Sequence, residues 1–251
     1  MKTRCPRPEC KKIFDLPDER AGKSDVCPFC TLRFSVRPLE ILEKIELETT
    51  RRKELVQKLS AETIENGASR GAELAGLMAI LEDVRSLWNV GSIFRTADGA
   101  GFQQLYLCGI TGCPPRKEIA KTSLGAEDVI AWEYAQSTLE VLPTLKSRGV
   151  FILGLEKTET SVDLSGFLND ERNAGKFSLP LCVVLGNEVS GVSAEALSYC
   201  DVVCHLPMRG IKESLNVAVA FGIASYMISQ AKAALVSEQR DPAVPMQGLL
   251  L

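Results

Sequence analysis

The 251-residue chain has a single histidine, His205, and no apolar run that approaches the ~20 residues a helix needs to cross a bilayer. Catalytic triads with a histidine base, and metal sites built from several histidines, are therefore nearly excluded. His205 itself lies in a strand-like apolar run, which favours a core position over a catalytic one. The amino terminus lacks the apolar segment of a secretory signal, so we expect a cytoplasmic protein.

The chain also has little net charge, −3 at pH 7, but that charge is unevenly distributed. Residues 1–37 contain nine Lys or Arg and five Asp or Glu, a surplus of four positive charges, whereas the remainder has 20 basic and 27 acidic residues. A basic appendage on an acidic body is typical of a module that contacts phosphates. Chance clustering of solvated charge is the alternative.

Cysteine is abundant at the amino terminus, where four of the nine cysteines occur as Cys5-x4-Cys10 and, after sixteen residues, Cys27-x2-Cys30. This is the spacing of a zinc ribbon, in which two thiolate pairs on tight turns complete a tetrahedron. About 35 residues bury too little surface to fold alone, and a metal would stabilise them. Disulfides are disfavoured in a cytosolic chain, and Cys27-Pro28-Phe29-Cys30 lacks the βαβ context of a redox dithiol.

The zinc prediction extends to the local fold of this segment. Residues 13–14 and 33–34 follow the two cysteine pairs at equivalent places, which predicts two short hairpins that share an apolar contact. With its Pro-Asp-Glu-x-x-Gly-Lys turn at residues 17–23, the segment resembles small bacterial zinc ribbons. The other cysteines are interpreted as small core residues; they are Cys108, Cys113, Cys182, Cys200 and Cys204.

The length and composition fit a catalytic domain with an appendage: hydrophobic residues (45%) and charged residues (24%) occur in globular proportions. We expect residues 1–37 to form the ribbon and residues 38–71 to form a helical linker, with a helix over 39–60 and a hinge at 65–71. The catalytic domain is expected over residues 72–238, followed by a tail at 239–251. Beyond the hinge, strands alternate with helices, which predicts a parallel sheet covered by helices. The expected strands are 77–81, 104–108, 150–155, 180–185 and 202–206, and the expected helices are 89–100, 139–147, 193–199 and 214–235.

Three segments rich in polar residues, 89–97, 185–191 and 206–218, are each predicted to connect a strand to a helix. Such loops meet at the carboxyl ends of parallel strands, where open α/β sheets bind their ligands. We therefore expect their side chains to converge on one crevice, as in an enzyme.

These segments resemble the three motifs of the SpoU (TrmH-type) family of RNA ribose 2′-O-methyltransferases, over about residues 75–235 and in the family's order. The first holds Asn-x-Gly-x-x-x-Arg-Thr, and the last holds Pro-Met and Ser-Leu-Asn-Val. The middle segment has Val189 where many members carry glycine. The resemblance implies an α/β, Rossmann-like parallel sheet with a carboxyl-terminal trefoil knot (SPOUT). It also implies S-adenosylmethionine bound at the knot loops, a homodimer, and structured tRNA or rRNA as substrate.

Arg95 is the residue that the resemblance carries over as catalytic, and the positions of four more polar residues in the motif segments nominate them beside it: Asn89, Glu188, Ser214 and Asn216. Glu188 follows a buried strand in a turn flanked by glycine, where its carboxylate is expected to fix loop amides or Arg95 itself. Because a guanidinium stays protonated and has no acceptor, we expect Arg95 to position and polarise the ribose hydroxyl rather than act as a base. Asn89 is expected to cap its helix and face the site, Ser214 to cap the last helix, and Asn216 to point into the crevice. Purely structural roles are the alternative for each, and a solvated surface position is the alternative for Arg95.

Cofactor contacts in the family are largely backbone, which by position nominates Leu155, Gly186, Leu206, Met208 and Leu215. Ordinary core packing is the alternative for the leucines and the methionine. Two other functions remain open. One is a knotted methyltransferase that modifies a base, which the Ser-Leu-Asn motif disfavours. The other is a zinc-ribbon RNA-binding or assembly protein without turnover, which the intact polar positions disfavour.

Overall fold

The computed structural model describes residues 1–7, 9–44, 47, 50 and 76–240. Residues 39–44 are helical, as expected for the start of the linker helix, whereas the rest of that helix, the hinge at 65–71, the domain boundary at 72 and the end of the tail lie outside the described residues. The last helix continues to Arg240, so the predicted tail boundary at 239 falls inside it.

The larger part of the chain, the body, is built on a sheet of seven parallel strands in the order β7-β6-β5-β10-β8-β11-β9. This confirms the predicted parallel sheet. Its central strand, β10, is buried along its whole length, which its uninterrupted apolar sequence explains. The strands are β5 (Leu77–Glu82), β6 (Gln104–Cys108), β7 (Ala131–Ala135), β8 (Phe151–Leu155), β9 (Val162–Asp163), β10 (Leu181–Leu185) and β11 (Val202–His205).

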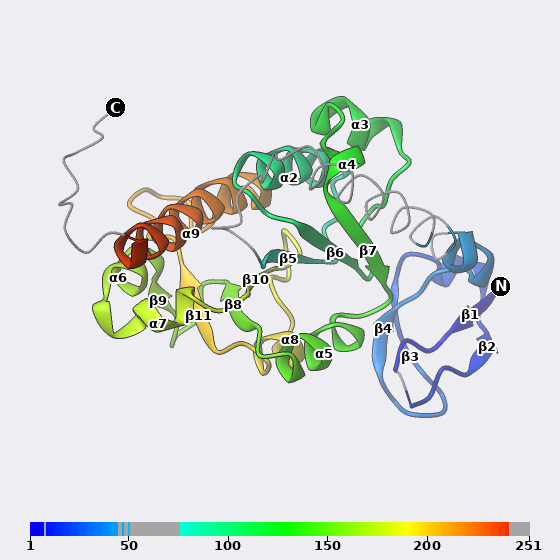
Figure 1. Cartoon of the computed structure of the whole chain (residues 1–251). Coiled ribbons are helices and arrows are strands. Elements are labelled where there is room, and N and C mark those ends of the chain that lie inside the picture. The colour runs from blue at the N-terminus through cyan, green and yellow to red at the C-terminus, as the bar shows by residue number, and fades with distance from the viewer. Residues whose placement is uncertain (8, 45–46, 48–49, 51–75, 241–251) are drawn as a thin grey trace.

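Helices cover both faces of this sheet and make a three-layer α/β fold (Figure 1). The upper layer in Figure 1 contains α2 (Leu87–Gly99) and α9 (Val217–Arg240), with α3 (Lys117–Ser123) and α4 (Ala126–Val129) packed on α2, and α6 (Leu164–Asn169) and α7 (Ala174–Phe177) beside α9. The lower layer contains α5 (Leu142–Ser147) and α8 (Ala194–Leu197).

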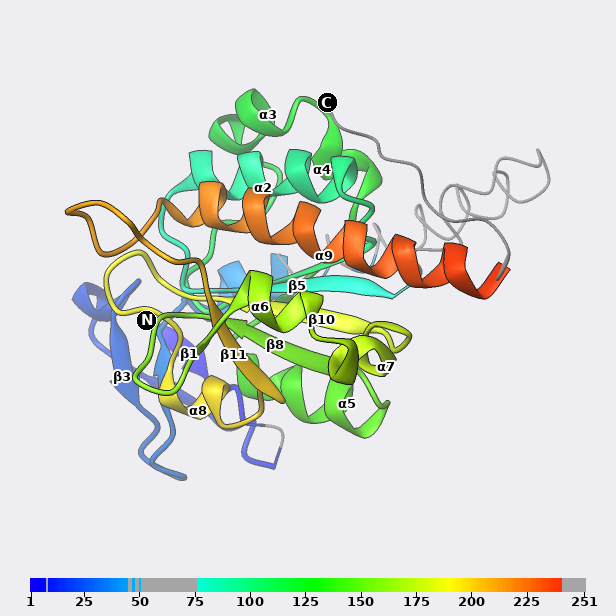
Figure 2. The same cartoon turned by 90° about the vertical axis from the view of Figure 1, so that its left-hand side faces the viewer.

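The strand order decides which loops meet. Because β10 inserts between β5 and β8, and β11 pairs with β8, the segments that follow β8, β10 and β11 leave the sheet side by side at its carboxyl edge. Figure 2 shows the loop after β11 projecting from this edge at the left. The trefoil knot implied by the resemblance stays a prediction.

The segment Val217–Leu235 of α9 is, among the described helices, long and apolar enough to span a membrane by length and composition. One side of it, with Phe221, Ala224 and Ile228, packs into the core, where Phe221 meets Phe102 edge-on at 5.2 Å between ring centres. Val219, Ile223 and Tyr226 are exposed on the other side. The helix is therefore a core helix that is apolar on two sides, and its outer side is exposed in the single chain.

The amino-terminal ribbon consists of two antiparallel hairpins, β1 (Lys2–Arg4) with β2 (Ile13–Asp15) and β3 (Ser24–Val26) with β4 (Arg33–Ser35). The ring of Phe14 contacts that of Phe34 edge-on, with 6.0 Å between centres. Both predicted hairpins and their shared apolar contact are confirmed.

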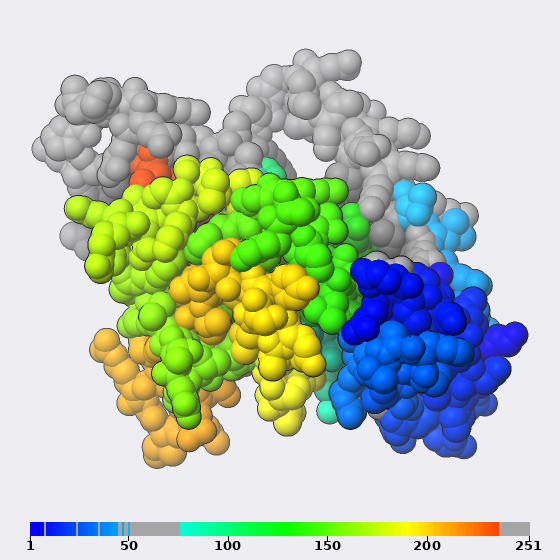
Figure 3. Space-filling model, turned by 90° about the horizontal axis from the view of Figure 1, so that it is seen from below, coloured from blue at the N-terminus to red at the C-terminus, as the bar shows by residue number. Residues whose placement is uncertain are grey.

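The ribbon lies next to the carboxyl ends of β6 and β7 (Figure 1), and it packs directly against the rest of the chain (Figure 3). Arg37 donates to the carbonyls of Gly109 (2.8 Å) and Thr111 (2.6 Å), and its guanidinium lies 4.6 Å from the centre of the Tyr134 ring. Gln136 donates to the Arg4 carbonyl at 2.7 Å. These contacts place the ribbon on the edge of the sheet where the three loops emerge.

Candidate functional site

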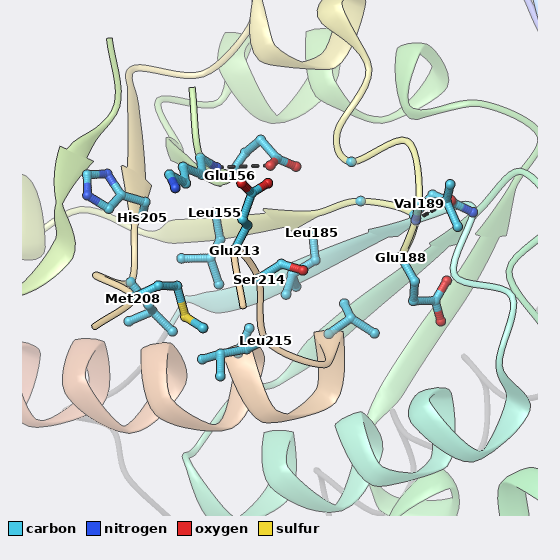
Figure 4. Close-up of a pocket in the computed structure, with 17 residues that line it drawn as sticks. Leu155, Glu156, Leu185, Glu188, Val189, His205, Met208, Glu213, Ser214 and Leu215 are labelled. Carbon is cyan, nitrogen blue, oxygen red and sulfur yellow. Dashed lines mark hydrogen bonds between the residues drawn. The ribbon is translucent and has the colours of Figure 1, made fainter. Parts of the chain in front are cut away.

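A cavity of about 210 Å³ lies at the carboxyl edge of the sheet, between the segments that follow β8, β10 and β11 (Figure 4). Apolar side chains form its floor, and the amino-terminal end of α9 closes one side. Glu213 and Ser214, in the segment that leads into α9, also line the cavity (Figure 4). All five residues nominated for the cofactor line it, namely Leu155, Gly186, Leu206, Met208 and Leu215. The structure therefore brings together residues that are up to 60 positions apart in sequence.

Gly186 allows two parts of the chain to touch at the base of this cavity. A Cβ on Gly186 would collide with the backbone of Gly191 and with the amide nitrogen of Val192. Residues 187 and 191 also form a backbone bridge, with Asn187 N to Gly191 O at 3.1 Å and Gly191 N to Asn187 O at 2.9 Å. The loop after β10 is thus closed on itself and presents backbone groups to the cavity.

Two side chains not predicted for the site hold this loop from either side. Asn187 donates to the carbonyl of Asp83 (2.8 Å) and accepts from the amides of Val189 and Ser190. Glu156, directly after β8, accepts from the amide of Val192 at 2.9 Å. Glu156 follows the last residue of β8 by one position, and Asn187 follows the last residue of β10 by two. A polar residue directly after a buried strand is a sequence signal that could have identified both.

Asn216, Asn89 and Glu188 form a polar row beside the cavity. Asn216 donates to the side-chain oxygen of Asn89 at 3.1 Å, and Asn89 donates to Glu188 at 3.0 Å. The carboxylate of Glu188 also accepts from the amides of Arg85 and Ser86, at 3.2 and 3.4 Å. All three motif segments meet in this row.

The environment of Glu188 favours its charged form. Partial burial alone would raise its pKa, but hydrogen bonds from its own amide, from Asn89 and from the amides of Arg85 and Ser86 together hold the pKa below its usual value. Since these amides precede or open α2, the carboxylate also lies near the positive end of the helix dipole.

The predictions about helix caps were wrong in three respects. Residues 89–97 are not a loop, because α2 begins at Leu87 and is capped by Ser86, whose oxygen accepts from the Asn89 amide at 3.3 Å. The last helix begins at Val217 rather than at residue 214, and Asn216 is its cap, accepting from the amides of Ala218 and Val219. Ser214 does not cap a helix but lines the cavity.

His205 differs from its prediction as well. It is half-buried at the end of β11 and lines the cavity, rather than lying in the core. Its Nδ1 shares a hydrogen bond with the Ser161 hydroxyl at 2.9 Å. The alternation of the strand decides this, because Cys204 takes the core position and His205 points to the opposite side.

Arg95 does not enter the cavity of its own chain, although the sequence predicted that it would converge there. Its side chain is exposed on α2 and makes no hydrogen bond to any residue that the structure describes. Seven residues, close to two helical turns, separate it from the exposed Trp88, so both lie on the same outer face of α2. Gly91, on another face of the helix, lets α2 approach α3, since a Cβ there would collide with Thr122 and with the backbone of Ile119.

A buried carboxylate missed by the sequence prediction links the ribbon side of the body to the cavity loop. Glu82, the last residue of β5, accepts from the amide and the hydroxyl of Ser193, both at 2.7 Å, and from the Thr138 hydroxyl at 3.1 Å. Burial raises its pKa, against the opposing effect of these hydrogen bonds. Ser193 caps α8 just after the cavity loop, and Leu139 packs into the ribbon core.

In the ribbon, the four cysteines predicted to bind metal come together. Their sulfurs all lie within 4.8 Å of one another, with Cys5 to Cys30 at 3.4 Å and Cys10 to Cys27 at 3.9 Å. A tetrahedral zinc with bonds of about 2.3 Å would hold its sulfurs about 3.8 Å apart. The donor set and its spacing therefore fit zinc.

Comparisons with known proteins place the catalytic body in a family. The model of the SpoU rRNA Methylase family matches residues 76–226, more than half of the chain. The 23S rRNA (guanosine-2′-O-)-methyltransferase RlmB of Pseudomonas aeruginosa is 30% identical over 156 residues, which cover 61% of this chain and 58% of that protein. The chain thus matches less than two thirds of the length of this relative, and the ribbon lies outside the family region.

Solved structures show the same fold. The TrmH/SpoU tRNA modifying enzyme of A. aeolicus superposes with a TM-score of 0.58 at 24% identity, covering 80% of this chain and 90% of that one. The AdoMet-bound rRNA methyltransferase of Sinorhizobium meliloti superposes with a TM-score of 0.56 at 27% identity, covering 62% and 56%. By its three motifs, its sheet and these matches, the chain belongs to the SpoU rRNA methylase family.

Proposed function

We propose that this protein is an S-adenosylmethionine-dependent methyltransferase that acts on the ribose 2′-hydroxyl of a structured rRNA or tRNA in the cytoplasm. One observation carries the proposal. The five nominated cofactor residues line a single cavity, and the polar row of Asn216, Asn89 and Glu188 borders it. Relatives named as rRNA and tRNA 2′-O-methyltransferases support the same activity.

The cavity has features that suit S-adenosylmethionine, which supplies a methyl group from its sulfonium. Leu155, Leu206 and Leu215 offer apolar surface for an adenine ring, and the loop closed by Gly186 offers backbone donors and acceptors for polar groups. Ser214 also lines the cavity and adds a hydroxyl group to it. The chain's own task is to orient the ribose hydroxyl and to withdraw its proton.

Arg95 is proposed to position the RNA and to stabilise charge that develops on the ribose oxygen. A guanidinium holds a phosphate bidentately and does not act as a base at neutral pH. Because Arg95 lies on the outer face of α2, it serves a site to which a second copy of the chain contributes. The exposed apolar side chains beside it, Trp88 on α2 and Val219, Ile223 and Tyr226 on α9, fit such a dimer contact.

A complementation experiment tests the shared site. Arg95→Ala and Gly186→Ala chains, each defective alone, are mixed under conditions that exchange subunits. A site built from two subunits predicts that the mixture regains methyl transfer, because one site in each mixed dimer is intact. No recovery, or a native chain that sediments as a monomer, would contradict the shared site.

We further propose that Cys5, Cys10, Cys27 and Cys30 bind one structural zinc ion. The ribbon core is small, so the metal would supply stability that apolar burial does not. Metal analysis of protein purified without chelator is expected to find one zinc per chain. Protein without bound metal that keeps its ribbon folded would contradict this.

The reaction itself is tested by incubating the full chain with methyl-labelled S-adenosylmethionine and rRNA or tRNA from cells that lack the protein. After digestion to nucleosides, the label is expected in a ribose-methylated nucleoside. A methylated base would show the other chemistry, and absence of transfer to both RNA classes would contradict the proposed activity. Mapping ribose methylation in RNA of the same cells identifies the target nucleotide.

A further inference from the structure

The tip of the ribbon exposes an aromatic ring that the ribbon core does not use. Phe29 lies in the turn between Cys27 and Cys30, and 54% of its surface is exposed, whereas Phe34 is buried in the core. Phe14 contacts Phe29 edge-on, with ring centres 6.0 Å apart and planes at 69°. The ring is therefore supported along one side by Phe14, and about half of its surface is open to solvent.

A cation lies next to this ring. The ammonium of Lys12 is 4.7 Å from the centre of the Phe29 ring, and Lys12 forms no ion pair with any described residue. Arg7 donates to the carbonyl of Cys30 at 3.2 Å and so adds a second positive charge at the same turn. An aromatic face beside unpaired positive charge matches a stacked base with its phosphate.

Two of the five acidic side chains of the ribbon are already paired with other cations. Asp18 pairs with the amino terminus at 2.7 Å, and Asp25 pairs with Arg20 at 2.7 Å. The ribbon as a whole keeps a surplus of four positive charges. The positive charge therefore favours a polyanion such as RNA as the partner of this turn. A protein surface with few acidic residues is disfavoured.

The ribbon that carries the ring is fixed to the body by direct contacts. Arg37 and Gln136 hold the ribbon to the body by direct hydrogen bonds, and Lys11 pairs with Glu140. Ribbon and cavity loops share the carboxyl edge of the sheet (Figure 2). An RNA bound both at the cavity and on the ribbon therefore contacts two parts of the protein that are fixed to each other.

We propose that Phe29 and Lys12 form a stacking platform for an unpaired nucleotide of the RNA substrate, outside the family's catalytic region. This inference rests on the proposed function, and it adds the form of RNA that the ribbon binds. Every base has a stackable face, so the platform selects single-stranded over duplex RNA without reading sequence.

The test measures binding of the full chain to a labelled single-stranded oligoribonucleotide of about 12 nucleotides and to its duplex. Phe29→Ala is expected to raise the dissociation constant for the single strand about fivefold or more, the lower end of the loss for one stacked base, with the duplex unchanged. Phe29→Trp is expected to keep the native affinity. Lys12→Ala is expected to lower the slope of log affinity against log salt by about one.

Ile13→Ala is the matched control, because Ile13 is an apolar ribbon residue with a similar exposed fraction, 51%, but no aromatic ring on which a base could stack. Zinc content and S-adenosylmethionine affinity, measured for each variant, establish that the ribbon and body stay folded. Equal affinity of Phe29→Ala and native chains for the single strand would overturn the platform and leave Phe29 as a contact for another protein. No measurable binding by the native chain would overturn it too.

The outcomes also separate this platform from the proposed function. Loss of single-strand affinity in Phe29→Ala, together with no methyl transfer by the native chain, supports the platform and contradicts the enzyme. Native methyl transfer with unchanged Phe29→Ala binding supports the enzyme and contradicts the platform.

Discussion

The cofactor cavity and the ribbon use opposite means to hold functional groups in place. The cavity lies at the edge of a sheet whose central strand is completely buried, and its loops are held by hydrogen bonds and close backbone contacts. The ribbon has a core of a few apolar side chains and brings four thiol groups together. Damage to the cavity should therefore act on chemistry and cofactor binding, and damage to the ribbon on its own folding and on RNA binding.

Arg95→Ala is expected to have the largest effect, a loss of about 10²- to 10³-fold in the rate of methyl transfer, the scale for removal of one group that stabilises developing charge. Cofactor affinity should stay unchanged because Arg95 does not line the cavity. Single-turnover rates and cofactor titration measure both quantities. Arg148→Ala, an exposed arginine near α5, is the control, and full activity of Arg95→Ala would contradict the assignment.

Gly186→Ala is expected to weaken S-adenosylmethionine binding about tenfold or more, because the new Cβ must push the loop away from Gly191 at a cost of about 1–3 kcal/mol. Calorimetric titration measures the change. Gly210→Ala is the matched control, since Gly210 is in the loop after β11 and a Cβ there would meet nothing within 4 Å. Equal effects of the two substitutions would show that the close contact at Gly186 is irrelevant.

Cys27→Ser tests the other side of the comparison. Loss of one thiolate is expected to release the metal and unfold the ribbon, and RNA affinity should then fall about tenfold through lost stacking and phosphate contacts. Cofactor affinity should change less than twofold. Cys200→Ser, outside the cluster, is the control. A large loss of cofactor affinity in Cys27→Ser would break the separation of the two regions.

Glu82→Gln examines where the two regions are connected. Glutamine keeps the size of the side chain, but only its oxygen accepts hydrogen bonds, whereas both carboxylate oxygens of Glu82 accept from Ser193 or Thr138. We therefore expect a loss of about 1–3 kcal/mol in the free energy of unfolding. Cofactor affinity should fall by a few-fold through the loop that ends at Ser193. Denaturant unfolding and cofactor titration measure these, with Glu195→Gln on the exposed side of α8 as control.

The smallest effect is a dependence on pH at Glu188. Because the folded pKa of this group is lowered, its charged form contributes stability above the unfolded pKa of about 4.3, and this is lost as pH falls through the folded value. The stability difference between native and Glu188→Gln chains should thus be greatest near neutral pH and shrink as the pH falls below about 4.3. Thermal unfolding across this range measures it. A difference independent of pH would contradict the role of the charge.

The sequence predicted the sheet, the ribbon hairpins and the position of the cavity because each depends on local patterns. The uninterrupted apolar run of β10 is short enough to favour a buried strand over a helix, and paired cysteines a few residues apart fit one tetrahedral metal. The helix starts were wrong because cap residues compete locally. Ser86 and Asn89 both suit an N-cap, as do Ser214 and Asn216, and tertiary partners choose between them.

The sequence by itself determined the family, five of the seven strands of the sheet and the residues that could meet at its carboxyl edge, because periodicity and motif spacing are properties of the chain alone. It missed the two edge strands, β7 and β9. Only the tertiary structure decided that Asn89 faces Glu188 instead of capping its helix, that Arg95 points away from its own cavity, and that the ribbon is fastened to the same edge. The physical reason is that the direction of a side chain depends on where its helix or strand packs, and that packing is set by residues distant in sequence.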